Sequence, residues 1–183
     1  MNSEPAIKFL CDDMLGKLGR WLRIIGQDVF YRNRIDNREL IEIAKRESRL
    51  VLTRDLRLVK TLAEERLPHS LVEENYPAHQ LKEVVEKFQD RIRIRVFSRC
   101  ADCNLELKAV DKEEVKDKIP PFVLKTQTYF RQCPHCQRVF WAATHRAQVD
   151  KQLKYVLGEL YDKLKEQVWP GDRIPGPGRN RQD

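Results

Sequence analysis

Four of the five cysteines form two Cys-x-x-Cys pairs, and this is the most specific chemical pattern in the chain. The pairs are Cys100 with Cys103 and Cys133 with Cys136, and 29 residues separate them. Two such turns can offer four thiolates to one ion, which completes the tetrahedral shell of a structural zinc site. Because a closed shell of four sulfurs leaves no open coordination position, we expect this zinc to hold structure and not to catalyse.

The spacing of the cysteine pairs raises a question of geometry. The gap exceeds the usual spacing of roughly 15–20 residues, and a long β-hairpin bent at Pro120 and Pro121 would accommodate it. Reduced cysteines without metal, or a redox pair, are the alternative interpretation. His135 could also be a ligand, but four sulfurs already suffice. The fifth cysteine, Cys11, lies in an apolar run and is expected in the core, where free cysteine is common.

Two apolar stretches run directly into an aspartate. Asp12 follows residues 8–11, Asp55 follows residues 49–54, and Asp36 precedes a helical pattern. Short apolar runs between helical patterns are typical of buried parallel strands. Such sheets bind their ligands outside the carboxyl ends of the strands. We therefore expect the three carboxylates to converge at one edge of a sheet.

A cluster of carboxylates is costly unless a cation neutralises it, because like charges raise one another's pKa. Oxygen ligands suit Mg²⁺ or Mn²⁺. Such an ion would activate water and neutralise charge on a phosphate during its displacement. The alternative interpretation is that Asp36 only caps a helix and Asp55 only starts a turn.

Basic residues flank these acids and recur further along the chain. A basic stripe beside a carboxylate cluster would hold a phosphodiester backbone against the metal, although such runs are also common on solvated helix faces. The candidate RNA contacts are Lys17, Arg20, Arg23, Arg54, Arg57, Arg93 and Arg95.

The elements that must position these residues alternate between strand and helix. Helical spacing or strand-like runs appear in turn over residues 14–25, 28–31, 40–44, 49–54, 56–66, 69–72 and 77–89, and Asp36 or Asn37 can cap the helix that contains residues 40–44. This βαβα order predicts an α/β fold with three layers, in which helices cover both faces of a mostly parallel sheet. The strict alternation in residues 91–97 predicts a half-buried strand with an arginine face.

The second half of the chain predicts smaller units. We expect an α/β domain over residues 1–97, a zinc ribbon over 98–145 and a C-terminal helix over 146–169. The apolar stripe of this C-terminal helix could pack on the α/β domain of the same chain or pair with a second copy in a homodimer. Residues 170–183 have too little apolar surface to order themselves.

Composition adds few constraints. The formal charge of +7 gives a weak preference for polyanions such as nucleic acid. The sequence contains no stretch that approaches the roughly 20 apolar residues of a membrane helix, and the first residues lack the features of a secretory signal. We therefore expect a cytoplasmic protein that does not contact membranes.

The stretch from Phe9 to Asp28 resembles the signature of the Mut-seven C-terminal RNase domain family, a PIN-like nuclease fold with an attached zinc ribbon. The resemblance covers roughly residues 6 to 148. It continues through residues 39–44, 52–55, 98–104, 119–121, 133–141 and His145.

The resemblance implies a metal-dependent ribonuclease with Mg²⁺ or Mn²⁺ at its active site. Asp12 matches the acid after the first strand, Asp55 the acid of the Thr-Arg-Asp motif and Asp36 the acid before the second helix. Asn37 and Arg38 depart from the family pattern, so either Asp36 or Glu39 supplies the second-helix carboxylate. Asp13 is adjacent to Asp12 but should point the other way.

Two other functions remain open at this stage. One is a non-catalytic RNA- or ribosome-binding protein in which the ribbon contacts RNA. The other is a phosphatase acting on small phosphate esters, since strand-end aspartates with Mg²⁺ serve both chemistries. The arginine-rich segment and the ribbon favour a polymer, so a ribonuclease that hydrolyses RNA phosphodiester bonds is the leading hypothesis.

Overall fold

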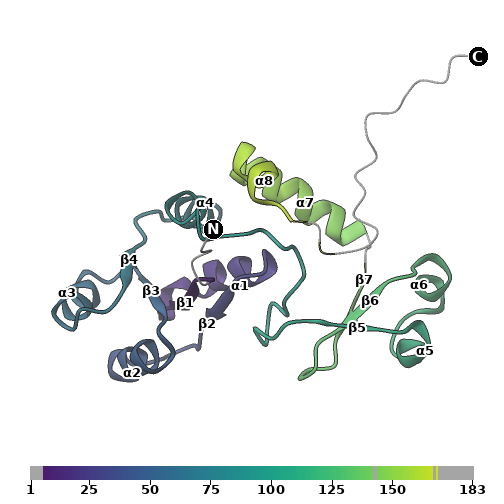
Figure 1. Cartoon of the computed structure of the whole chain (residues 1–183), viewed down its shortest axis with the longest axis horizontal. Helices are drawn as coiled ribbons and strands as arrows, with labels where there is room; N and C mark the ends of the chain where they lie inside the picture. Colours follow the sequence, from purple (N-terminus) through teal and green to yellow (C-terminus); the bar gives the residue numbers. More distant parts are fainter. Residues whose placement is uncertain (1–5, 142–143, 167, 169–183) are drawn as a thin grey trace, which may run out of the picture.

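The four short apolar runs of the first half pair into one parallel sheet. A computed structural model describes residues 6–141, 144–166 and 168 (Figure 1). The strands are β1 (Lys8–Cys11), β2 (Asp28–Phe30), β3 (Leu50–Thr53) and β4 (His69–Leu71), in the order β2-β1-β3-β4. Since all four run the same way, the residues that follow them meet at one edge.

Helices cover both faces of this sheet, as the βαβα order predicts. Helices α1 (Gly16–Ile24) and α4 (Pro77–Lys87) pack on one face, and α2 (Asn37–Glu47) and α3 (Leu56–Glu64) lie over the other (Figure 1). Successive strand residues serve opposite layers: Phe9 and Cys11 join the core under α1, whereas Leu10 joins the core under α2. Cys11 is fully buried, as expected.

The predicted strand over residues 91–97 is wrong, although its alternation is real. Ile92, Ile94 and Val96 are buried in the core and the residues between them are exposed. The segment instead crosses the α/β unit with one bridge, from Ile94 to Lys165, and a hydrogen bond from Arg95 N to Ile25 O of 2.9 Å. The alternating burial therefore reflects an extended segment that pairs at one bridge and, among the described residues, does not form a strand.

The C-terminal helix packs on its own α/β unit. The stripe expected over 146–169 forms two helices, α7 (Thr144–Leu157) and α8 (Glu159–Leu164), because Gly158 between them has a φ of 58° that favours glycine. Leu153 and Leu157 of α7 join the same core as α4. Residues 170–183, predicted to be a disordered tail, and the side chain of His145 lie outside the described residues.

The cysteine-rich segment forms a second, smaller sheet. Strands β5 (Lys108–Val110), β6 (Phe130–Gln132) and β7 (Val139–Trp141) pair antiparallel in that order. Helices α5 (Lys112–Val115) and α6 (Pro121–Thr126) lie between β5 and β6 along the chain.

The chain segment between the two cysteine pairs is therefore not a simple β-hairpin. Pro120 and Pro121 begin α6 instead of bending a hairpin, which suits a residue that has no N–H to offer. Within the described residues, no helix is both long and apolar enough to cross a membrane.

Candidate functional site

Asp12 ends the central strand β1 and is almost fully buried, with 5% of its surface exposed. Its carboxylate accepts hydrogen bonds from the Thr53 hydroxyl, from Met14 N at 3.0 Å and from Arg54 N at 3.3 Å. Burial raises the pKa of Asp12 above its ordinary value, while these hydrogen bonds lower it and the nearby Asp55 charge raises it further. Burial thus makes the Asp12 charge less favourable than in water, and the three hydrogen bonds offset part of that cost.

Thr53 connects Asp12 to Asp55. The Thr53 hydroxyl donates to Asp12 and accepts from Asp55 N at 2.9 Å, and Thr53 is fully buried at the end of β3. Asp55 itself caps α3 by accepting from Arg57 N at 2.8 Å. The neighbouring strands β1 and β3 therefore place two carboxylates at the same sheet edge. Thr53 was not singled out from the sequence; its place two residues before Asp55 in the Leu52–Asp55 motif was the available signal.

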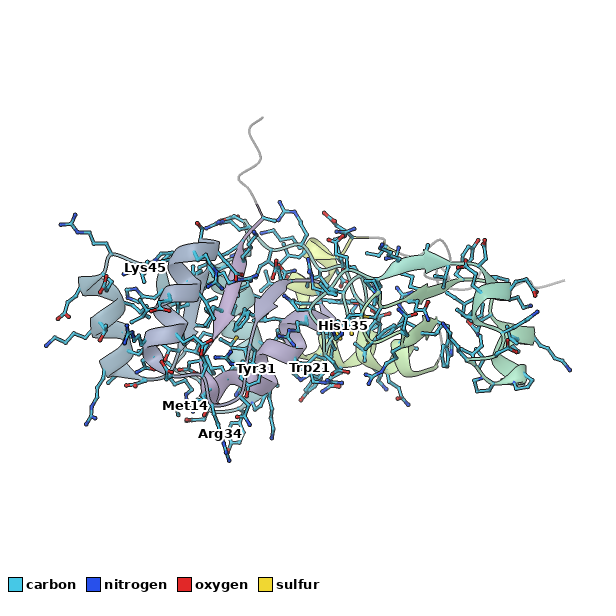
Figure 2. The ribbon with its side chains drawn as sticks, turned by 90° about the horizontal axis from the view of Figure 1, so that it is seen from below. Met14, Trp21, Tyr31, Arg34, Lys45 and His135 are labelled. Carbon is cyan, nitrogen blue, oxygen red and sulfur yellow. The ribbon has the colours of Figure 1, made fainter. Side chains whose placement is uncertain are left out.

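Three further acids lie next to β1 and in the segment that follows β2: Asp13, Asp36 and Glu39. Asp13 is exposed and accepts from Arg34 N at 2.6 Å, which ties the loop to the end of β1. Figure 2 shows Met14, Tyr31 and Arg34 gathered at this part of the α/β unit. Asp36 accepts from Glu39 N at 2.9 Å as the cap of α2, and the Glu39 carboxylate forms an ion pair with Arg32.

The structure does not draw Asp12, Asp36 and Asp55 into one ligand group. Among the described residues, the group of three or more His, Cys, Asp or Glu residues that could share a metal consists of the four cysteines. A three-carboxylate Mg²⁺ or Mn²⁺ site therefore stays a prediction. Asp36 caps α2, as the alternative interpretation expected, and Asp55 caps α3, where that interpretation expected the start of a turn.

Three of the predicted RNA contacts lie beside the acids. Lys17 is exposed at the start of α1, and Arg57 is exposed in the first turn of α3. Arg54 follows β3 directly and donates to the Asn75 side-chain oxygen near the end of the loop between β4 and α4. Arg20 is exposed further along α1 and forms an ion pair with Asp102 of the first cysteine turn.

Arg23 does not face a ligand. The residue is 8% exposed, and its guanidinium donates to three backbone carbonyls: Val29 O at 2.9 Å, Ala101 O at 3.2 Å and Asp102 O at 2.9 Å. The three-residue spacing predicts that Lys17, Arg20 and Arg23 lie near one face of α1. In the structure the first cysteine turn covers the C-terminal part of that face. In this structure Arg23 therefore links α1 to β2 and to the first cysteine turn.

Arg93 and Arg95 lie at the opposite edge of the sheet. They share a surface hollow with Lys8 and Asp28, the first residues of β1 and β2. Both guanidinium groups lie 3.9 Å from the Glu166 carboxylate. The expectation that these arginines grip RNA stays a prediction, and any such contact would lie away from the acids, which follow the other ends of the strands.

Exposed apolar side chains surround the acids and were not identified from the sequence. Met14, Leu56 and Tyr76 follow β1, β3 and β4 and are 63%, 68% and 70% exposed. Consecutive strands of one sheet thus place three open apolar surfaces at the edge that holds Asp12. Single exposed apolar residues are ordinary, but three at one edge indicate a surface for flat or apolar groups.

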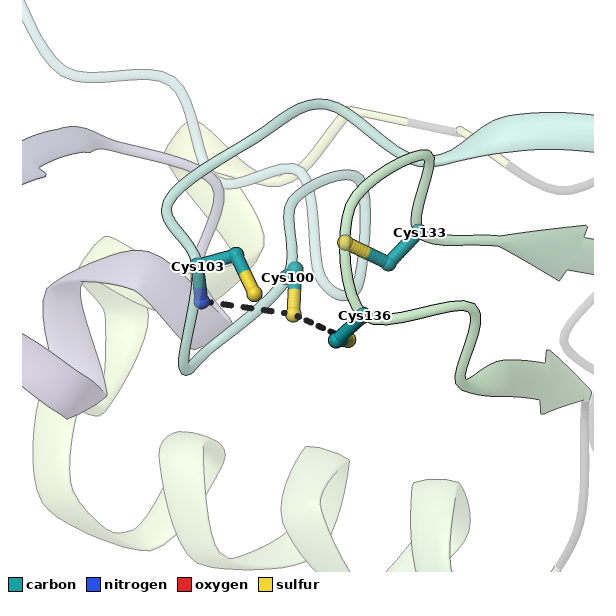
Figure 3. A group of neighbouring side chains, drawn as sticks. All are labelled: Cys100, Cys103, Cys133 and Cys136. Carbon is teal, nitrogen blue, oxygen red and sulfur yellow. Dashed lines mark hydrogen bonds between the residues drawn. The ribbon is translucent and has the colours of Figure 1, made fainter.

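The four cysteines lie close together at the end of the ribbon that faces α1 (Figure 3). Their sulfur atoms all lie within 4.8 Å of one another, and the Cys100 and Cys136 sulfurs are 3.9 Å apart. Sulfurs about 2.3 Å from a central zinc ion in a tetrahedron would be separated by similar distances. The predicted ligand set therefore fits a zinc ion. His135 is exposed, with Nδ1 3.6 Å from the Cys103 sulfur.

The electrostatics of this cluster also favour a cation. Burial raises the pKa of the Cys103 thiol to about 12 and raises that of Cys100, with neighbouring cysteines adding to the effect. The Arg138 N–H lowers the pKa of Cys136. Because several thiolates so close together repel one another, a bound cation is what would hold all four sulfurs deprotonated.

The fold and the cysteine cluster define a three-layer α/β protein with a small, potentially metal-binding ribbon. A model of the Mut7-C RNAse domain family matches residues 7–153, and the chain belongs to this family. Over 105 residues the chain is 34% identical to a human protein, the exonuclease mut-7 homolog. That match covers 55% of this chain and 12% of the human protein. No solved structure matched the chain.

Proposed function

We propose that this protein is a ribonuclease that hydrolyses RNA phosphodiester bonds with a divalent cation held at the carboxyl edge of the sheet. The observation that carries the proposal is the link from Asp12 through the Thr53 hydroxyl to Asp55, in a chain of the Mut7-C RNAse domain family. It also agrees with the nuclease name of the human relative.

The oxygen-rich composition of the site fits Mg²⁺ or Mn²⁺. Asp12 and Asp55 would hold the ion, with Asp36 as the third carboxylate because Arg32 already neutralises Glu39. The ion would neutralise charge on the phosphate and activate the attacking water. Thr53 and the N–H groups of Met14 and Arg54 hold Asp12 in one orientation, so the site needs little rearrangement.

Substrate contacts come from the same edge. Lys17, Arg54 and Arg57 supply positive charge for the phosphate backbone. The exposed side chains of Met14 and Tyr76 supply surfaces on which unpaired bases can rest. The four-cysteine ribbon would bind zinc as a structural ion beside the α/β domain, which we place over residues 1–97, with the ribbon over 98–145.

The deciding experiment measures Mn²⁺-dependent cleavage of labelled RNA, with chelator as a blank. Asp12→Asn and Asp55→Asn should abolish cleavage while leaving RNA binding nearly intact, because each removes a charge that the cation requires. Asp90→Asn is a matched control, since Asp90 is exposed after the C-terminal end of α4, away from the acids. If Asp12→Asn and Asp55→Asn cut as fast as the wild type, the assignment of the site is wrong.

Two further arms refine the mechanism. A loss of cleavage in Asp36→Asn but not in Glu39→Gln would assign the third ligand to Asp36, and the reverse result would assign it to Glu39. A circular RNA, which has no ends, separates internal cleavage from the end-directed cleavage that the name of the human relative describes.

One observation favours a non-catalytic RNA-binding function instead. Asp36 and Asp55 cap helices, and the three aspartates do not form a ligand group in the structure. In that case the wild type would bind RNA without cutting it, with or without Mn²⁺, and the aspartate variants would bind equally well.

A further inference from the structure

A cavity of about 360 Å³ lies between the α/β unit and the ribbon, apart from the carboxylates. Its walls come from the C-terminal half of α1, from residue 97, from the first cysteine turn, from β7 and from the start of α7. Asp12 precedes α1, whereas the cavity is lined by Arg20 and Ile24 in the second half of that helix. At about 1.5 Å per residue, these two residues lie about 6 and 12 Å along the helix from its first residue.

Half-buried apolar side chains form much of the lining. Ile24, Phe97, Phe140 and Trp141 all line the cavity and all keep part of their surface open. The rings of Phe97 and Phe140 lie 6.4 Å apart and are tilted by 36°. Flat apolar surfaces of this kind bind other flat rings by stacking.

Three arginines line the same cavity. Arg20 and Arg138 both form ion pairs with Asp102, so two guanidinium groups share one carboxylate. Arg146 also lines the cavity, from the first turn of α7. Aromatic rings beside guanidinium groups suit a ligand that joins a flat apolar ring to an anion.

We propose that this cavity binds one unpaired base of an RNA strand together with its phosphate, and so anchors the substrate at a distance from the carboxylates. This inference rests on the proposed ribonuclease function. The volume lies near the lower end of small-ligand sites, which span about 300–1,000 Å³, and so suits one nucleotide and not a duplex. A base inside a double helix is already stacked and paired, so only unpaired RNA can occupy the cavity.

The direct test uses Trp141 as the reporter. In a Trp21→Phe, Trp169→Phe protein, Trp141 is the one remaining tryptophan, and single-stranded octauridylate should quench its fluorescence by stacking. A duplex RNA of the same length should leave the fluorescence unchanged. Equal quenching by duplex, or no quenching by octauridylate, would overturn the proposal.

Variants then separate this cavity from the carboxylate site. Arg138→Gln and Phe140→Leu should each weaken octauridylate binding about tenfold. They should also raise KM for cleavage with little change in kcat, because they do not touch the reacting phosphate. Arg46→Gln, an exposed arginine on α2, is the matched control. Zinc content and thermal unfolding check that Phe140→Leu folds.

The two proposals can fail separately. Cleavage by the wild type with unchanged binding by Arg138→Gln and Phe140→Leu would refute the base-binding cavity alone. Quenching of Trp141 and weakened binding by these variants, without any cleavage by the wild type, would refute the ribonuclease while leaving the cavity assigned.

Discussion

The Thr53 hydroxyl is the smallest group on which the geometry of the proposed site depends, and its removal can be analysed from the structure. It donates to the buried Asp12 carboxylate and accepts from Asp55 N at 2.9 Å. Thr53→Val replaces the hydroxyl with a methyl group of similar size. The variant therefore removes both hydrogen bonds without opening a cavity.

The expected loss of stability follows from these contacts. A hydrogen bond to an ionised carboxylate contributes about 1.5–3 kcal/mol, and the Asp55 N–H left without its acceptor costs about 1 kcal/mol more. Burial of the additional methyl group recovers about 0.8 kcal/mol. The net destabilisation is about 2–3 kcal/mol, which corresponds to a melting temperature lower by about 4–12 °C for a chain of this size.

Thermal and urea unfolding of metal-free protein test this value, with Thr53→Ser as the control. Serine keeps the hydroxyl and loses one buried methyl, so its cost should be about 1 kcal/mol. The hydroxyl lowers the pKa of Asp12, so its contribution is fully present where Asp12 is ionised and falls as acidification protonates that carboxyl. If Thr53→Val is as stable as Thr53→Ser, or its deficit grows on acidification, the hydroxyl does not hold Asp12 as described.

Two further predictions concern the ribbon and its attachment. Purified protein should contain about one zinc per chain, and Cys136→Ser should lose it whereas Cys11→Ala should not; metal analysis decides this, and equal zinc in both variants would contradict the four-cysteine site. Arg23→Met should lower the free energy of unfolding by about 3 kcal/mol or more, because three carbonyls lose their donor. Arg20→Gln, which breaks an exposed ion pair on the same helix, should lower the free energy of unfolding in urea by at most about 1 kcal/mol. If Arg23→Met and Arg20→Gln lower it equally, the structural role given to Arg23 is wrong.

The parts of the fold that follow from local pattern could be predicted from the sequence. Residues 8–11 and 50–53 form strands because short apolar runs between helices bury both faces in a parallel sheet. The order of strands and helices then places Asp12 and Asp55 at one edge without further information. The two Cys-x-x-Cys turns likewise predict their own cluster, since each turn fixes two ligands locally.

The parts that depend on long-range packing could not be predicted in this way. Helical spacing shows that Arg20 and Arg23 lie near one face, but not that the first cysteine turn covers that face. Alternation shows that Arg93 and Arg95 are exposed, but not that they lie beside the starts of the strands. The single helix expected after residue 146 ends at Gly158, whose left-handed backbone could not be inferred from an apolar stripe alone.

The contacts around the first cysteine turn explain how a structural metal can matter to a distant carboxylate site. Arg23 of α1 holds the turn through its carbonyls, while Asn104 at the end of the turn accepts from Val29 N at 2.9 Å and donates to Asp28 at 2.8 Å. The turn therefore covers the free edge of β2 and fixes the C-terminal part of α1. The other end of α1 follows directly from Asp12. An ion bound by the four cysteines would therefore also support α1, which begins shortly after Asp12, and β2, which pairs with β1, without being part of the carboxylate site.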